Sequence, residues 1–163
     1  MSEFVPTLYM VCGIVAAGKS TLCQELASRR QTILVSEDHW NSTLFPGEIN
    51  TIDDYRRCSK RVRQAIGPHV TELLKAGLSV VLDFPANTVP NRNWMKGIFE
   101  SAAAASELHF LDVPVEICKA RLRLRNSQGE HPYQTSDADF EKIVSYFVAP
   151  ELDEGFNIVR HRD

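Results

Sequence analysis

The stretch Gly13-Ile14-Val15-Ala16-Ala17-Gly18-Lys19-Ser20-Thr21 decides the fold. It satisfies the pattern G-x-x-x-x-G-K-[ST], in which two glycines bracket a loop and a lysine and a hydroxyl residue follow. The glycines allow backbone angles and a close approach that a Cβ would prevent. Successive backbone amides in such a loop point at phosphate oxygens, and the N-terminus of the following helix adds its positive end. The stretch therefore predicts a phosphate-binding loop between a strand and a helix.

Each position of this loop has an expected part in binding ATP with Mg²⁺. Lys19 is expected to reach the β- and γ-phosphates, and Ser20 is expected to ligate Mg²⁺. The predicted nucleotide-binding set is Gly13, Ala16, Ala17, Gly18, Lys19, Ser20 and Thr21. Ala16-Ala17 stand where many such loops carry glycine or serine, which stiffens the loop but changes no required position. A chance match in a Gly/Ala-rich turn is the alternative, and it is disfavoured because an apolar run leads in and a helical pattern leads out.

Apolar runs alternate with helical patterns along the chain. Buried strands are expected over residues 7–12, 32–35, 79–83, 107–112 and 156–159. Helices are expected over about 19–30, 54–76, 90–105, 114–126 and 137–148, and a loop over 41–53. Gly67-Pro68 is expected to kink or split the second helix, and Gly77 is expected to end it. The alternation predicts an α/β, three-layer P-loop NTPase fold, with a mainly parallel five-stranded sheet, helices on both faces and a helical lid.

The bulk composition bounds the kind of protein. The chain has 163 residues, 44% of them hydrophobic and 24% charged, so one globular domain over residues 1–163 is expected. A net charge of −3 argues against a dedicated binder of long nucleic acid. Cys12, Cys23, Cys58 and Cys118 show no disulfide or zinc spacing and are expected to be free thiols. With no signal-peptide pattern and no membrane-length apolar run, the cytoplasm is the expected compartment, with no membrane partner.

Acidic residues stand at the ends of three predicted strands. Ligands of a parallel sheet lie beyond the carboxyl ends of its strands, so these acids are expected near the phosphates. Asp83 is predicted to hold Mg²⁺, with a turn cap as the alternative. Asp38 is predicted to accept the proton of an acceptor hydroxyl during phosphoryl transfer, although Glu37 is its neighbour and either acid could cap a helix. Asp112 is expected to cap the helix that follows it.

Cations stand late in the chain, on the predicted lid. Arg121 and Arg125 are four residues apart and therefore share a helix face, whereas Arg123 faces elsewhere. Guanidinium groups that arrive from a lid can stabilise the charge of a transferring phosphoryl group. Arg121 and Arg125 are therefore predicted to be catalytic, with a solvated basic face as the alternative.

Further residues are candidates for the acceptor side. Arg92 follows the third strand and is a second candidate contact for the acceptor. The basic residues between Arg56 and Arg63 are expected to form a solvent face, with contact to an anionic acceptor as the alternative. Trp40 and Trp94 are expected either to line the acceptor pocket or to pack in the core.

Taken together, these motifs resemble a known family, the small P-loop kinases grouped as AAA-type ATP-binding proteins of the zeta-toxin and polynucleotide-kinase-like kind. That group also includes chloramphenicol phosphotransferase. The residues that carry the resemblance are Gly13 to Thr21, Ser36-Glu37-Asp38, Val80 to Asp83, Leu111-Asp112-Val113-Pro114, Arg121 to Asn126, Phe147 with Pro150, and Glu154-Gly155. The resemblance implies ATP-dependent phosphorylation of a hydroxyl, with Asp38 at the base position, Arg125 at the lid arginine and Asp83 at the second acid. The segment 39–53 matches no member of known substrate.

Three functional hypotheses follow. The leading one is a Mg-ATP-dependent kinase whose partners are a nucleotide and a small hydroxyl-bearing molecule. The second is a P-loop ATPase or nucleotide-dependent switch with no phosphoryl acceptor. The third is a toxin-like kinase that acts on a nucleotide sugar or on a nucleic-acid end, and the absence of a strong basic stripe disfavours its nucleic-acid branch. The residues specify neither the acceptor, nor ATP over GTP, nor the oligomeric state.

Overall fold

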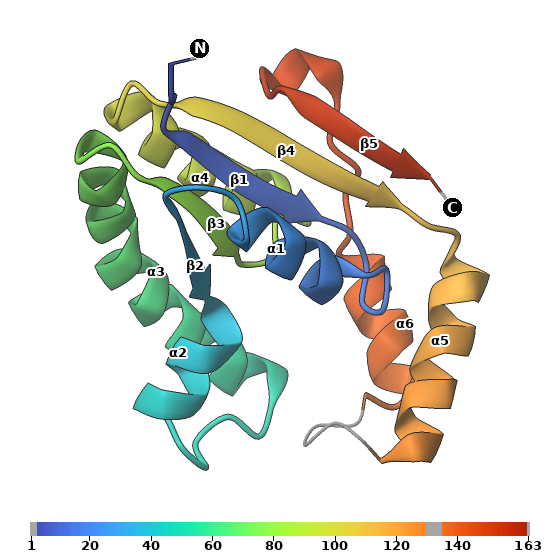
Figure 1. Cartoon of the computed structure of the whole chain (residues 1–163). Coiled ribbons are helices and arrows are strands. Elements are labelled where there is room, and N and C mark those ends of the chain that lie inside the picture. The colour runs from blue at the N-terminus through green and yellow to red at the C-terminus, as the bar shows by residue number, and fades with distance from the viewer. Residues whose placement is uncertain (1–2, 130–134, 163) are drawn as a thin grey trace.

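Five parallel strands form one sheet in the order β2-β3-β1-β4-β5 (Figure 1). The computed structural model describes residues 3–129 and 135–162. The strands are β1 (Thr7–Cys12), β2 (Thr32–Ser36), β3 (Ser79–Asp83), β4 (Ala105–Asp112) and β5 (Ile158–Arg162). Every neighbouring pair in this sheet is parallel. The predicted parallel five-stranded sheet of an α/β fold is therefore confirmed.

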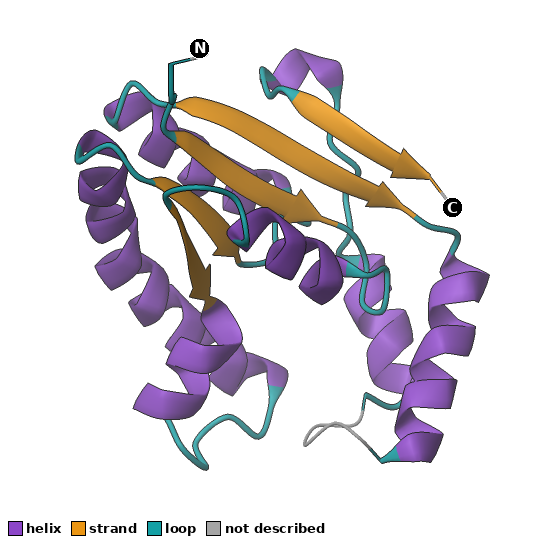
Figure 2. Ribbon diagram, viewed as in Figure 1, coloured by secondary structure: helices purple, strands orange, loops and turns teal. Residues whose placement is uncertain are grey.

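Helices connect the strands, as the ribbon in Figure 2 shows. They are α1 (Lys19–Ala27), α2 (Glu37–Leu44), α3 (Ile52–Lys75), α4 (Val89–Ser101), α5 (Val115–Gln128) and α6 (Asp137–Ser145), with a short 3-10 turn at Leu152–Glu154. None of these helices is both long enough and apolar enough to cross a membrane.

The two faces of β1 carry different helices because its side chains alternate between them. Leu8 and Met10 join a buried core with residues of α3 and α4, such as Ile66. Tyr9 and Val11 point the other way and pack with residues of α1. In Figure 1, α1 accordingly crosses the near face of the sheet while α3 and α4 lie behind it. This is the predicted three-layer arrangement.

Several helix boundaries differ from the sequence expectation. Residues 41–44 belong to α2 rather than to a loop, because Ser36 caps that helix by accepting a hydrogen bond from the His39 N–H. α3 is not split at Gly67-Pro68, since its apolar stripe stays buried on both sides of the proline. Gly77 does end α3, and its φ of 95° lies in the left-handed region that glycine favours.

The bounds of three elements in the C-terminal part of the chain also differ from the sequence expectation. The predicted helix over 90–105 ends at Ser101, because Ala105 already pairs with Thr7 of β1. α6 ends at Ser145, short of the expected residue 148. The last strand starts at Ile158 rather than at residue 156, because Phe156 is buried in the core instead.

Arg92 is an internal structural residue and not a contact of the acceptor. Its side chain is fully buried, and its guanidinium donates to the Glu154 carboxylate at 2.9 and 3.2 Å. It also donates to the carbonyl oxygens of Ala86 at 2.9 Å and Val148 at 2.7 Å. The acceptor-side prediction for Arg92 is therefore wrong, because these contacts occupy the guanidinium and fasten α4 to the segment before β5.

We expect Arg92→Met to lower the free energy of unfolding by about 3 kcal/mol or more, because removal of one partner leaves a partly buried charge and unpaired carbonyl groups. Arg160→Met is the control, since Arg160 pairs with Asp112 on the surface and should cost less than about 1 kcal/mol. Urea denaturation of both variants measures the difference. Equal, small losses would contradict the structural role of Arg92.

Candidate active site

The loop between β1 and α1 begins at a glycine that is closely packed against β4. A Cβ on Gly13 would lie 3.2 Å from the Leu111 Cβ and 3.3 Å from the Leu111 carbonyl oxygen. The Gly13 N–H donates to the Asn87 side-chain oxygen at 3.0 Å. Gly18 has a φ of 107°, which favours glycine, and it caps α1 without any side-chain hydrogen bond. The first amides of α1 are therefore left available to an anion.

Ala16 takes a left-handed backbone conformation, with a φ of 68°. For a residue with a Cβ this conformation costs roughly 1–2 kcal/mol. Packing of the neighbouring loop residues offsets the cost, because Ile14 and Ala17 share a buried cluster with Leu122 of α5 and Phe140 of α6. The loop therefore depends on the two C-terminal helices for its shape.

Lys19 folds back over the loop that precedes it. Its Nζ donates to the Gly13 carbonyl oxygen at 2.6 Å. Burial lowers the pKa of Lys19, while the nearby acidic groups of Cys12, Asp83, Cys23 and Asp38 act in the opposite direction. Ser20 and Thr21 follow as exposed residues in the first turn of α1. An ammonium at this place faces the same space as the free amides.

Asp83 and Asp38 come together because β2 and β3 pair in register. Ser36 at the end of β2 lies opposite Asp83 at the end of β3, and Asp38 follows in the first turn of α2. Burial, and then the charge of Asp38, raise the pKa of Asp83. The Cys23 thiol hydrogen-bonds the Asp83 carboxylate, and burial together with that carboxylate raises the pKa of Cys23 to about 12. The structure thus brings Lys19, Asp38 and Asp83 to one edge of the sheet.

Glu37 and Asp38 are separated by burial, although they are adjacent in sequence. The Glu37 side chain is only 3% exposed and accepts a hydrogen bond from the Tyr55 hydroxyl, whereas Asp38 is exposed. Burial raises the pKa of Glu37. Neither acid caps α2, because Ser36 does. Asp38 is therefore the acid that an incoming molecule can reach.

Asp112 does not cap α5, so that prediction is wrong. Its carboxylate accepts hydrogen bonds from the Arg160 guanidinium of β5, and Arg162 lies 4.0 Å away. α5 begins instead after Pro114, without a side-chain cap. The carboxylate of Asp112 pairs with arginines of β5 because β5 runs parallel to β4 and places Arg162 opposite Asp112.

α5 and α6 form the predicted helical lid beside the loop. Lys119 pairs with Glu141 at 2.8 Å, and Arg123 pairs with Asp137 at 2.9 Å, which joins the two helices. Arg121 is exposed on α5. Arg125 is half-buried, and its Nε has no hydrogen-bond partner among residues 3–129 and 135–162. Arg123 is therefore engaged, while Arg125 keeps a buried donor for another group.

Two residues near the loop were missed by the sequence analysis. Asn87 joins the loop to the C-terminal segment, since its side chain accepts from Gly13 and its carbonyl accepts from the Val148 N–H at 2.8 Å. The sequence signal for Asn87 was its position, four residues after the strand-end acid Asp83. Cys23 was assigned only to the group of free thiols, and all four cysteines are indeed buried thiols outside any disulfide.

Comparisons with known proteins agree with this geometry. A family model described as AAA domain matches residues 8–150, whereas no curated protein matches the chain. A candidate kinase from Chloroflexus aurantiacus J-10-fl has a TM-score of 0.76 at 22% identity, covering 99% of this chain and 87% of its own. Kti12 of Chaetomium thermophilum, in complex with ADP-AlF3, gives 0.72 at 16% identity over 96% and 89%. The Mycobacterium tuberculosis APS kinase CysC, in complex with AMPPNP and APS, gives 0.64 at 16% identity over 98% and 90%. These likenesses show a shared fold.

We expect Gly13→Ala to lower the free energy of unfolding by about 1–3 kcal/mol, because the added methyl group overpacks against Leu111. Gly97→Ala is a matched control in α4, where an added Cβ meets no atom within 4 Å. That variant should gain about 0.5–1 kcal/mol from helix propensity. Chemical denaturation measures both, and a stabilised Gly13→Ala variant would show that the loop is not tightly enclosed.

Proposed function

The chain belongs to the AAA domain family, and we propose that it is a Mg-ATP-dependent kinase that phosphorylates a hydroxyl group. The acceptor is a small molecule or a nucleotide. The observation that carries the proposal is the placement of an exposed carboxylate, Asp38, beside Lys19 and Asp83 at the end of the phosphate loop. A loop that only bound nucleotide would not need this exposed acid on its acceptor side.

The residues of the loop fit a nucleoside triphosphate. The uncapped amides at the start of α1 and the Lys19 ammonium supply donors, and Lys19 would exchange the Gly13 carbonyl for phosphate oxygens. Ser20 and Asp83 would hold Mg²⁺, which commonly binds through one or two protein oxygens together with phosphates and water. In the described part of the chain, no cluster of three or more His, Cys, Asp or Glu side chains offers a metal site by itself. Bound Mg²⁺ supplies charge neutralisation on the phosphates.

Asp38 acts as the base of the transfer. The acceptor oxygen forms a bond to the γ-phosphorus, and the bond from that phosphorus to the bridging oxygen breaks, leaving its electron pair on ADP. The hydroxyl proton passes to the Asp38 carboxylate. Cys23 holds Asp83 by a hydrogen bond, which restrains the orientation of this second acid.

Arg125 and Arg121 stabilise the phosphoryl group as it moves. Positive groups that are fixed before the reaction lower the barrier most, because they need no reorganisation. The buried, unpartnered Nε of Arg125 supports its part. Arg121 lies one turn earlier on the same face of α5. Arg123 is paired with Asp137 and takes no part.

The two other hypotheses predict different products. A P-loop ATPase or switch would release ADP at a rate that no acceptor changes. A toxin-like kinase would phosphorylate a nucleotide sugar or a nucleic-acid end in preference to small metabolites. A panel of hydroxyl-bearing metabolites, antibiotics and oligonucleotides, scored for ADP release above background, separates all three.

We expect Asp38→Asn to reduce acceptor-dependent ADP release by about 10²–10⁴-fold, because the amide cannot take the proton. The Kd for Mg-ATP should stay within about twofold, since Asp38 lies outside the loop. Asp53→Asn, an exposed acid in the first turn of α3, is the control and should keep the parent rate. Undiminished turnover by Asp38→Asn would remove Asp38 from the mechanism.

We expect Arg125→Ala to lower kcat by about 10²–10³-fold with ATP affinity unchanged, as for loss of one preorganised donor. Arg123→Ala, two residues away on the same helix, should change kcat little. Steady-state ADP release and an equilibrium ATP titration distinguish the two effects. Equal losses of kcat in both variants would mean that α5 and α6 affect activity only through their folded structure, and not through the Arg125 side chain.

A further inference from the structure

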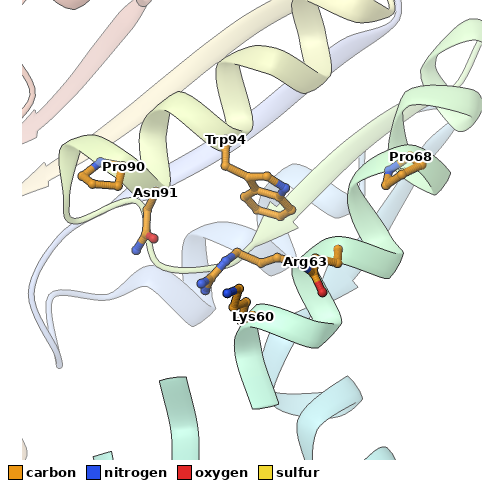
Figure 3. A pocket seen from close by; sticks show the side chains of 7 residues that line it. Lys60, Arg63, Pro68, Pro90, Asn91 and Trp94 are labelled. Atoms are coloured by element: carbon orange, nitrogen blue, oxygen red, sulfur yellow. The ribbon is translucent and has the colours of Figure 1, made fainter. Parts of the chain in front are cut away.

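A pocket lies between α3 and α4. Its volume is about 340 Å³, which suits a small molecule. Its lining includes Lys60, Arg63, Gln64, Pro68, Asn91 and Trp94. A second hollow continues along the same two helices and shares Trp94 as a wall. In Figure 3 the Arg63 side chain extends from α3 below the Trp94 indole, with its guanidinium on the side of Asn91, and Lys60 is drawn beneath it.

Two residues that line the pocket interact with the sequence neighbours of the candidate catalytic acids. Trp94 packs against Phe84, with ring centroids 5.4 Å apart, and Phe84 directly follows Asp83. On the other wall, the positive charge of Arg63 acts on the carboxylate of Glu37, which directly precedes Asp38. A molecule in this pocket therefore lies beside the edge of the sheet at which phosphoryl transfer is proposed.

The two cations of this pocket have no direct ion-pair partner, although the charge of Arg63 acts at longer range on Glu37. In the parts of the chain that the structure describes, Lys60 and Arg63 make no ion pair or hydrogen bond. Neighbouring cations on α3 are engaged, since Arg57 pairs with Asp54 at 3.4 Å and Arg56 stacks on the Tyr146 ring at 5.0 Å. Two cations without a hydrogen-bonded acidic partner at the rim of a pocket favour an anionic group.

The second hollow, at the end away from Lys60 and Arg63, is lined by an acidic residue. Glu72 lines the second hollow, and its carboxylate disfavours an anion there. The indole between the two ends is closely fitted to α3, because a Cβ on Gly67 would come within 3.1 Å of the Trp94 Nε1. The flat face of Trp94 with Pro68 gives an apolar wall for a ring or a carbon chain. The anionic end of a ligand therefore belongs at Lys60 and Arg63.

We propose that this pocket binds the phosphoryl acceptor, and that the acceptor carries a phosphate, sulfate or carboxylate group held by Lys60 and Arg63. Its ring or carbon chain lies against Trp94, and its hydroxyl reaches Asp38. The inference rests on the proposed kinase function and narrows its substrate class, because neutral sugars and neutral antibiotics would leave the two cations unpaired. Phosphorylated, sulfated and carboxylated acceptors share this chemistry.

Binding of matched anionic and neutral probes tests the inference without any need for turnover. The phosphate loop is first filled with Mg-AMPPNP, so that anionic probes cannot bind there. Ribose 5-phosphate is then compared with ribose, gluconate with glucose, and AMP with adenosine, by calorimetry and by tryptophan fluorescence. At least one anionic probe should bind about tenfold more tightly than its neutral partner. The three pairs distinguish sugar phosphate, sugar acid and nucleotide as the source of the charge.

Variants locate the effect in the pocket. The double variant Lys60→Gln/Arg63→Gln should bring the anionic and neutral probes to within about twofold of each other. Arg61→Gln is the matched control, because Arg61 is exposed on the same helix but does not line the pocket, and it should keep the discrimination. Trp94→Phe should reduce the fluorescence response to what Trp40 alone gives, while calorimetry still detects binding. Circular dichroism checks that each variant is folded.

Other results would contradict the pocket assignment, the kinase proposal, or both. Absence of binding by every anionic probe, equal binding of the two members of every pair, or an equal loss of discrimination in Arg61→Gln would overturn the pocket assignment. If the double variant loses anion binding but no acceptor ever raises ADP release in the parent protein, the pocket is supported and the kinase proposal fails. If a neutral acceptor is phosphorylated equally by the parent and the double variant, the kinase proposal stands and the pocket assignment fails.

Discussion

The close approach of Gly13 to β4 is the constraint on which the rest of the site depends. β1 lies in the middle of the sheet, so its last residues are surrounded by β3 and β4. Gly13 follows directly, at a place where a Cβ would lie only 3.2 Å from the Leu111 Cβ, and its N–H donates to Asn87. Asn87 in turn holds Val148, and Arg92 holds Val148 and Glu154. The loop is thus fixed by contacts from three distant parts of the chain before any ligand arrives.

The charged residues of the site lie together because they follow the carboxyl ends of neighbouring parallel strands. Lys19 is desolvated at the same edge that carries Asp38 and Asp83, so its charge is supported by acids rather than by water. The three acids near this edge differ in burial and in their hydrogen-bond partners. Glu37 is enclosed with Tyr55, Asp83 is held by Cys23, and Asp38 alone of the three is exposed to an incoming molecule. Lys60 and Arg63 line the pocket between α3 and α4. In the proposed reaction they would hold the acceptor, so that charges of opposite sign would surround the transferred group.

The sequence predicted those features that depend on local patterns. The loop, the bounds of β1 and β3 and the meeting of Asp38 with Asp83 followed from motif spacing and from the direction of parallel strands. Features that depend on tertiary contacts were not predictable in this way. The alanines after Ser101 have high helix propensity, yet Ala105 is taken into the sheet by β1. Arg92 and Asp112 gave no signal of their buried and lateral partners, because Glu154 and Arg160 lie about 50 residues or more away in sequence.

The central claim is that the loop over residues 13–21 binds Mg-ATP, and it is tested most directly by calorimetric titration of Mg-ATP into the parent protein and Lys19→Ala. The parent should bind with a stoichiometry of one. Lys19→Ala should bind at least about tenfold more weakly, since an ammonium that contacts phosphate is lost from a desolvated site. Unchanged affinity in the Lys19→Ala variant, or no binding by the parent, would contradict the account.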